Sequence, residues 1–357
     1  MAQRVYLHVG TPKSGTTYLQ AGLWQNREPL RDLGILFPGR GPFDHNRASI
    51  VVRKGRHLPG RKRGVPPLWR RFTDQAAAYD GTVVLSNEWY LAADADQITA
   101  AVDQLGGEKV HVVVTTRTLV RLVPAAWQES LKVGRGHSLA DFVDGLGDGR
   151  TKWTWDVLDP AAVARHWASV VGPERVHVVT MPERPTHAGQ LWERFARTVG
   201  FDPEAVELPP REANESMSVQ AARLMQEFGP ALRAEVDGHD ASWRGHARWL
   251  RTAVVRRVLA GVPGDPIGVG EELRGDLLAR GERIVADLRA LGCPVTGDLE
   301  ELLGGTDREG SRHPDSVTEA ELLEVSRQLA VGLLAGQIDR AAADGDGHDH
   351  DEEEDDE

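Results

Sequence analysis

At 357 residues and 40% hydrophobic content, the chain is long enough for one large α/β core, which excludes a wholly disordered protein. Most of the formal net charge of -12 lies at the C-terminal end, because residues 344–357 hold ten acids and no lysine or arginine. The rest of the chain, with 44 acids against 42 bases, is nearly neutral and offers no general basic surface for duplex nucleic acid.

The cysteine content and the hydropathy of the chain indicate where in the cell we expect the protein. Cys293 is the single cysteine, so no disulfide forms within the chain and nothing asks for an oxidising environment. The N-terminus enters a strand-like run within a few residues, and no apolar run approaches the roughly 20 residues of a membrane helix. We expect a cytoplasmic protein with no membrane partner and no metal site, ending in a disordered acidic tail.

The N-terminal elements predict a strand, a glycine-rich turn and a helix. Residues 4–9 alternate as a short strand, 10–15 form the turn, and 16–32 carry a helical stripe of leucines. A short strand is predicted at 35–37. Residues 39–67 are rich in glycine, proline and arginine and predict a long excursion without core elements.

Strands and helices then alternate. Strands are predicted at 82–85, 110–114 and 175–179, and helices at 68–79, 94–105, 119–133, 160–171 and 190–199. This alternation predicts a P-loop-type three-layer α/β fold, with a central parallel sheet flanked by helices and ligands bound at the carboxyl ends of the strands.

The C-terminal third predicts helices alone, at 217–228, 243–259, 273–291 and 319–343. We divide the chain into an α/β domain at 1–305 with a helical layer from about 210, a C-terminal helix at 306–343 and the tail at 344–357.

The turn Gly10-Thr11-Pro12-Lys13-Ser14-Gly15-Thr16-Thr17 lies where the first strand ends and the first helix begins. Backbone amides of a glycine-rich turn and the positive end of a helix make an anion site, so phosphate is the expected ligand. The hydroxyls of Thr16 and Thr17 are predicted to donate to phosphate oxygens, and Lys13 supplies a mobile charge.

The place of the lysine separates this turn from that of ordinary nucleotide triphosphatases. Their lysine follows the second glycine, whereas here Thr16 has that position and Lys13 stands three residues earlier. No carboxylate is evident as a magnesium partner. The turn therefore favours a phosphorylated donor that needs no metal.

Residues 11–17, read as Thr-Pro-Lys-Ser-Gly-Thr-Thr, resemble the 5′-phosphosulfate loop of the sulfotransferase family that uses 3′-phosphoadenosine-5′-phosphosulfate (PAPS) and releases PAP. The resemblance extends over about residues 1–305, is strongest in the loop, and is most similar to the actinobacterial branch. The high ratio of arginine to lysine, 36 to 6, suits a GC-rich bacterial source. The stretches that carry the weaker similarity are 110–117, 178–182, 191–195, 214–218 and 297–299.

The resemblance implies that the donor is bound by Pro12, Lys13, Ser14, Gly15, Thr16 and Thr17, and that Arg117 binds the 3′-phosphate. The family's usual serine eight residues after that arginine is replaced by Ala125. Ser130, Arg121 or Gln128 are the alternatives for its role. Arg117 itself is otherwise interpreted as a surface or helix-capping residue.

Three residues are candidates for the chemistry of transfer. Lys13 is predicted to compensate charge on the leaving oxygen, and Glu88, at the end of the strand 82–85, to act as general base. A helix-entry or salt-bridge carboxylate is the other interpretation of Glu88. His45 is the alternative base, and a loop histidine without a role is the other interpretation. His8 and His111 are interpreted as core or edge histidines.

We expect a hydroxylated small molecule or carbohydrate as acceptor. The eight lysines and arginines of 53–71 either contact donor or acceptor or form a solvated loop, and Trp127, Trp153 and Trp155 line either a pocket or the core. The alternative functions are a P-loop small-molecule kinase and an inactive nucleotide-binding homologue. The sequence does not set the oligomeric state.

Overall fold

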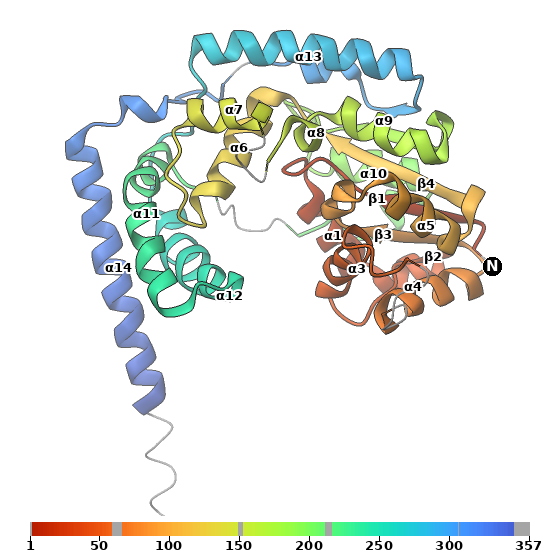
Figure 1. The fold of residues 1–357 in the computed structure, drawn as a ribbon, viewed down its shortest axis with the longest axis horizontal. Coiled ribbons are helices and arrows are strands. Elements are labelled where there is room, and N and C mark those ends of the chain that lie inside the picture. The colour runs from red at the N-terminus through yellow and green to blue at the C-terminus, as the bar shows by residue number, and fades with distance from the viewer. Residues whose placement is uncertain (1, 59–65, 149–152, 211–215, 306, 346–357) are drawn as a thin grey trace, which may run out of the picture. The chain divides into compact units, whose positions relative to one another are not determined.

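The structure is a computed structural model that describes residues 2–58, 66–148, 153–210, 216–305 and 307–345. The chain divides into two compact units that interleave along the sequence (Figure 1). Unit 1 comprises Met1–Val123, Asp144–Glu212 and Glu272–Thr306, and unit 2 comprises Pro124–Val143, Ala213–Glu271 and Asp307–Glu357. The predictions for the acidic tail after residue 345, the basic residues 59–65 and the motif residues 214 and 215 lie outside the described residues.

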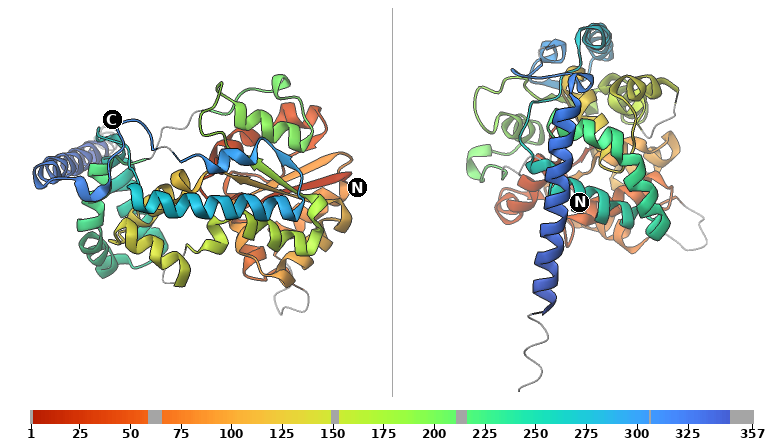
Figure 2. Two further views of the ribbon diagram at one scale, coloured as in Figure 1. Left: turned by 90° about the horizontal axis from the view of Figure 1, so that it is seen from above. Right: turned by 90° about the vertical axis from the view of Figure 1, so that its left-hand side faces the viewer.

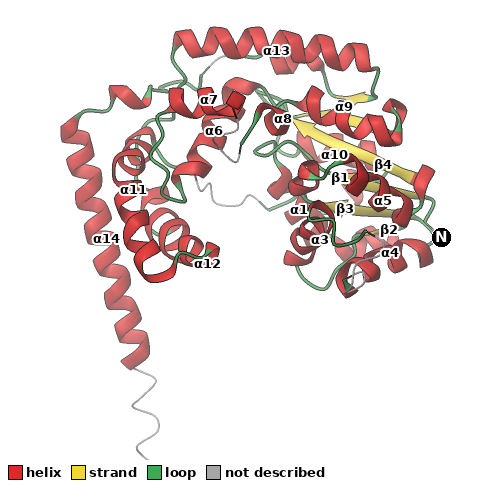
Figure 3. Cartoon of the chain, in the orientation of Figure 1, coloured by secondary structure: helices red, strands yellow, loops and turns green. Residues whose placement is uncertain are grey.

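Unit 1 is built on a six-stranded parallel sheet, drawn in yellow in Figure 3. The strands lie in the order β2-β3-β1-β4-β5-β6. Their bounds are Arg4–His8 for β1, Ile35–Leu36 for β2, Thr82–Ser86 for β3, Val110–Thr116 for β4, Val176–Thr180 for β5 and Val295–Thr296 for β6. The central strands are valine-rich and buried, as expected for a parallel sheet covered on both faces. The predicted α/β fold class is confirmed.

The strand order positions a site. From β1 the chain runs to the edge strand β2 and returns to β3 beside β1, and from β3 it crosses to β4, β5 and β6 on the other side of β1. The carboxyl end of β1 is therefore a topological switch point, where parallel sheets open a crevice for ligands. Backbone pairing places His8 level with Ser86 of β3 and, on the other side, with Val113 of β4.

Helices cover both faces of the sheet. Figure 2 shows α10 (Gln190–Val199) on one side of the sheet and α9 (Pro160–Val171) on the other. On the first side, alternate strand positions such as Tyr6, Val84 and Val113 form one core with residues of α1 and α10. The helices lying mainly in unit 1 are α1 (Thr16–Gln25), α2 (Arg27–Asp32), α3 (Phe43–Arg53), α4 (Pro67–Ala78), α5 (Ala95–Leu105), α8 (Trp155–Leu158), α9, α10 and α13 (Glu271–Leu291).

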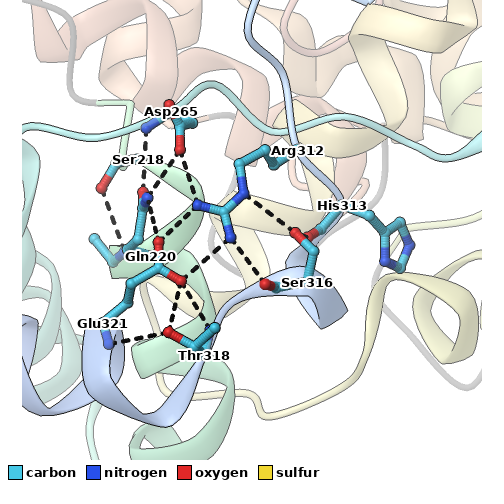
Figure 4. A network of polar contacts seen from close by, with 9 residues as sticks. Ser218, Gln220, Asp265, Arg312, His313, Ser316, Thr318 and Glu321 are labelled. Carbon is cyan, nitrogen blue, oxygen red and sulfur yellow. Dashed lines mark hydrogen bonds and ion pairs between the residues drawn. The ribbon is translucent and has the colours of Figure 1, made fainter.

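Unit 2 is helical. Its elements are α11 (Val219–Asp240), α12 (Trp243–His246), a π-helix at Ala247–Arg256 and α14 (Glu319–Gly345), and the unit boundaries fall inside α6 (Leu119–Leu131) and α7 (Leu139–Asp148). Arg312, in the segment before α14, joins three parts of the unit (Figure 4). Its Nη1 donates to Asp265 over 3.0 Å and to Glu321 over 2.6 Å, and Gln220 of α11 donates to the same two carboxylates.

The structure corrects four element predictions. Residues 43–53 form helix α3, whose buried Ala48, Val51 and Val52 were masked by polar neighbours in the sequence. The single helix predicted at 16–32 is broken at Asn26, because the Asn26 side chain donates to the Gly22 carbonyl and accepts from the Glu207 amide.

The other two corrections concern the C-terminal third. It contributes the two-residue strand β6, too short to show any periodicity. The helix predicted at 243–259 is a short α-helix followed by the π-helix. Within the described ranges, every helix is too short or too polar for a transmembrane span.

Candidate functional site

The loop after β1 folds as a tight turn into α1. Gly10 (φ 48°), Lys13 (φ 65°) and Gly15 (φ 89°) have left-handed backbone, and Lys13 is the one non-glycine residue in the described ranges with positive φ. The Thr11 amide donates to the Thr115 carbonyl of β4 over 2.7 Å and fixes the start of the turn. Left-handed residues among right-handed ones point successive amides toward the same concavity, which is an anion-binding geometry. The strain of about 1 kcal/mol at a non-glycine residue in this region is typical of ligand-gripping sites.

Thr16, the first residue of α1, carries an unsatisfied polar atom. Its side chain is 4% exposed, and its Oγ1 is buried without a hydrogen-bond partner. Such a group costs about 1–3 kcal/mol unless a ligand satisfies it. A Cβ at Gly10 would lie 2.8 Å from this Oγ1, so glycine is needed there as well as for the backbone angle. The amides of the first turn of α1 have no intrahelical acceptors, so a phosphate oxygen fits beside Thr16.

Lys13 and Arg117 meet at this loop. Arg117 directly follows β4, and its Nη1 donates to the Lys13 carbonyl over 3.2 Å. Both side chains are half-buried. The loop therefore has two cationic residues, Lys13 from the turn itself and Arg117 from the neighbouring strand.

The remaining loop residues have different surroundings. Thr17 is exposed and Pro12 is buried. Ser14 is fully buried and its hydroxyl donates to the Thr11 carbonyl over 2.5 Å, so this side chain braces the turn from inside. Gly15 packs against Leu191 of α10, where a side chain would not fit.

Glu88 lies at the carboxyl end of β3, the strand beside β1. It begins the 3₁₀ helix Glu88–Ala92 and is half-buried. The Asn87 side chain accepts from the Trp89 amide over 3.1 Å and starts this helix. The Asn87 amide donates to the His8 carbonyl over 3.0 Å, so Glu88 is tied to the strand that carries the loop.

His45 lies on α3 and not in a loop, and it is 3% exposed. Its Nε2 is 2.8 Å from the Pro38 carbonyl, and its Nδ1 accepts from the Ser86 amide over 3.3 Å. Its ring stacks on Phe37 with centroids 4.1 Å apart. Burial lowers the pKa of His45 to about 4. Since both ring nitrogens are engaged, the surroundings of His45 favour a supporting role over that of a base.

The alternatives for the second 3′-phosphate ligand fall in different units. Arg121 is half-buried in unit 1. Gln128 accepts from the Met217 amide over 2.9 Å, and Ser130 donates to the Trp127 carbonyl over 2.7 Å, all within unit 2. The side chains of Gln128 and Ser130 thus have structural partners already.

The predicted tryptophans separate into two kinds. Trp127 is fully buried, whereas Trp153 is half-buried with its ring centroid 6.0 Å from that of Trp89. The guanidinium of Arg53 lies 5.4 Å from the centroid of Trp89, and its Nε is buried without a partner. The guanidinium of Arg280 lies over the ring of Trp155, 3.8 Å from the ring centroid. Trp89, the residue after Glu88, therefore belongs to an aromatic pair with an arginine beside it.

The polar residues under the loop were not predicted as a group. His8, Ser86 and Thr115 lie on three adjacent strands and are joined by hydrogen bonds. The sequence signal was present, because each is a polar residue near the carboxyl end of an otherwise apolar strand. In the described part of the chain, no group of three or more histidines, cysteines or carboxylates is arranged to hold a metal ion.

Comparison with protein-family models found no match, and comparison with curated proteins found none either. Among solved structures, the chain is similar to a sulfotransferase from Alicyclobacillus acidocaldarius. The identity is 17%, the match covers 82% of this chain and 96% of that chain, and the TM-score is 0.40. At that level the likeness carries no weight for function, which we infer from the loop and its surroundings.

Proposed function

We propose that this chain is a sulfotransferase that transfers the sulfuryl group of PAPS to a hydroxyl of an acceptor. The observation that carries the proposal is the loop at the switch point: Lys13 in left-handed backbone before Gly15, followed by the buried, partnerless hydroxyl of Thr16. An anion fits this loop, and the lysine stands at the position that the PAPS-binding motif has. Supporting this, Arg117 lies against the same loop.

Different residues of the loop and of the end of β4 bind different parts of the PAPS molecule. The amides of the first turn of α1 and the Thr16 hydroxyl bind the 5′-phosphate, with Thr17 at the exposed rim. Pro12, Ser14 and Gly15 shape the turn, and Ser14 contributes its amide. Arg117 binds the 3′-phosphate, for which a planar guanidinium with several donors is suited.

Transfer needs charge compensation and a base. The acceptor oxygen attacks sulfur while the bond from sulfur to the bridging oxygen of the 5′-phosphate breaks, which releases PAP. Lys13 stabilises the charge that develops on that bridging oxygen. Glu88 takes the proton of the acceptor hydroxyl, because it lies half-buried at the carboxyl end of β3, beside the strand that carries the loop.

The acceptor side is proposed at the end of β3. Trp89 and Trp153 offer aromatic faces next to Glu88, and Arg53 adds a cation beside them. Such an arrangement suits a ring-containing acceptor, either a carbohydrate or a phenol. A screen of hydroxylated acceptors with labelled PAPS identifies which class is turned over.

Calorimetric titration with PAP, ADP and ADP plus magnesium tests the function. We expect PAP to bind and ADP to bind at least about tenfold more weakly, because ADP lacks the 3′-phosphate that Arg117 contacts. A preference for ADP with magnesium would indicate the kinase instead. Binding of neither nucleotide would overturn the proposal, and binding of PAP without turnover of any acceptor would indicate the inactive nucleotide-binding homologue.

A further inference from the structure

A chain of buried side-chain hydrogen bonds runs beneath the loop, from β3 through β1 to β4. Ser86 Oγ lies 2.8 Å from His8 Nδ1, and His8 Nε2 lies 3.0 Å from Thr115 Oγ1. Thr115 Oγ1 lies 2.8 Å from Ser14 Oγ, which donates to the Thr11 carbonyl over 2.5 Å. All five residues are 0% exposed, so no bulk water competes for these bonds.

The last link fixes the direction of every other link. A carbonyl oxygen only accepts, so the single hydroxyl proton of Ser14 is committed to Thr11. The 2.8 Å contact between Ser14 and Thr115 therefore needs the proton of Thr115. Thr115 must then accept from His8 Nε2, and His8 Nδ1 must accept from the Ser86 hydroxyl.

The opposite tautomer of His8 leaves one of these contacts without a proton. With hydrogen on His8 Nδ1, Thr115 would have to donate to Nε2. The oxygens of Thr115 and Ser14 would then face each other at 2.8 Å with no proton between them, at two residues that are 0% exposed to bulk solvent. The neutral form with hydrogen on Nε2 is the one that satisfies all four contacts. Burial acts in the same direction, since it lowers the pKa of His8 to about 3 and keeps the ring uncharged.

Both ends of the chain of bonds lie at the proposed site. At one end, Ser14 braces the loop whose Lys13 and Thr16 are proposed to hold the donor. At the other end, Ser86 lies two residues before Glu88, and its amide and carbonyl are held by His45 and Gln20. A shift of the His8 ring would therefore move both the loop and the carboxyl end of β3.

We propose that His8, as the neutral tautomer with hydrogen on Nε2, is a positioning residue that couples the phosphate loop to the strand end carrying Glu88. The tautomer follows from the hydrogen bonds alone, whereas the positioning role rests on the proposed function. His8 does not contact the donor; it acts through Thr115 and Ser14.

Nitrogen NMR of histidine-labelled wild-type protein tests the tautomer, with the His8 signal assigned by its loss in His8→Gln. We expect hydrogen on Nε2 and no titration between about pH 5 and about pH 8. A signal with hydrogen on Nδ1, or one that titrates in this range, overturns the assignment. This measurement does not depend on any ligand.

A double-mutant cycle on PAP affinity tests the coupling. His8→Leu and Thr115→Val each break the chain of bonds, and each is expected to weaken PAP binding about tenfold. Because they break the same chain, the double variant should lose no more than about tenfold in total. Fully additive losses, about a hundredfold, would show that the two residues act separately and would overturn the coupling.

The conservative variant separates positioning from bulk packing. His8→Gln keeps an N–H donor near the place of Nε2 and should recover PAP affinity to within about threefold of wild type. If His8→Gln is as weak as His8→Leu while both melt like wild type, the donated hydrogen bond is not what positions the loop. If wild type itself does not bind PAP, the proposed function fails, and the NMR result still decides the tautomer.

Discussion

Lys13 occupies a backbone conformation that most side chains avoid, and it does so between two glycines that share the left-handed region. Any residue with a Cβ would be similarly strained there, so the backbone does not require lysine. The backbone conformation fixes where the Lys13 side chain leaves the turn, beside the first turn of α1. In the proposed function, the property of Lys13 that matters is its positive charge.

We expect Lys13→Ala to lower sulfuryl transfer by about a hundredfold or more while leaving the melting temperature within a few degrees of wild type. The reason is the loss of charge compensation at the leaving oxygen, with no change in packed area. Lys109→Ala is the matched control, because Lys109 directly precedes β4 and so lies at the amino ends of the parallel strands, whereas the loop lies at their carboxyl ends. Turnover of Lys13→Ala close to that of the control would remove Lys13 from the mechanism.

Glu88→Gln keeps the size of the side chain and removes its basicity. Turnover should fall by about 10²–10⁴-fold, the usual worth of a general base, while the affinity for PAP stays within about twofold. Steady-state rates and calorimetry on the same preparation measure the two quantities. A variant with unchanged turnover would show that another group accepts the proton.

At this scale the sequence predicted the loop but not how its side chains are turned. The spacing of Gly10, Lys13 and Gly15 predicted a tight turn between β1 and α1, and the structure has these three residues in left-handed backbone. The inward direction of Ser14 depends on Thr115, and the role of His8 depends on Ser86 and Thr115, which are 78 and 107 residues away from it. Hydrogen bonds across strands have no signature in local sequence.

Among the elements, α14 is joined to the rest of unit 2 by polar contacts of Arg312 and Gln220 with Glu321. Arg312 donates to Asp265, which lies in the segment before α13, and to Glu321 in the first turn of α14 (Figure 4). Thr318 and Glu321 also form the capping pair that begins the helix. The Arg312 guanidinium, with the Thr318 contacts, holds the pKa of Glu321 well below its usual range.

Arg312→Met should therefore lower the melting temperature of unit 2 by several degrees, because two carboxylates lose their shared cation. The loss should be largest near neutral pH and shrink as acid protonates Glu321, whose folded pKa is lowered and whose contribution disappears as the pH falls. Calorimetry of Arg312→Met against Arg308→Met, an exposed arginine of the same segment, measures it. Equal melting of the two variants would contradict the joining role.

Element prediction succeeded where burial leaves a periodic pattern and failed where side chains act individually. Strands β1, β3, β4 and β5 were predicted within a few residues, since their continuous apolar runs are dictated by two covered faces. Helix α3 was missed because its polar residues, such as Asp44 and His45, are buried by specific partners. The break at Asn26 likewise depends on Glu207, far along the chain.

For the molecule as a whole, the buried His8 and His45 and the half-buried His177 predict sensitivity to acid. Burial lowers the pKa of His8 to about 3 and those of His45 and His177 to about 4, from an ordinary value of 6.5. Between pH 6.5 and about 4, the unfolded chain binds protons at these sites and the folded chain does not. Stability should therefore fall as the pH is lowered through this window.

Urea unfolding at about pH 7 and about pH 4.5 measures the loss, and His177→Gln should make it smaller by removing one of the three sites. His239→Gln, at an exposed position, is the control and should unfold with the pH dependence of wild type. An unchanged pH dependence in His177→Gln would show that the His177 ring has the same pKa in the folded and in the unfolded chain.

The central place of β1 has a consequence for how such a chain can diversify. Because β3 and β4 flank β1 on opposite sides, the segment ending in Glu88 and the segment ending in Arg117 reach the loop from separate directions. With the proposed roles, mutations after β3 change which hydroxyl compound is the acceptor and leave nucleotide binding unchanged. Replacing residues 87–93 with those of a homologue should then transfer the acceptor preference of that homologue.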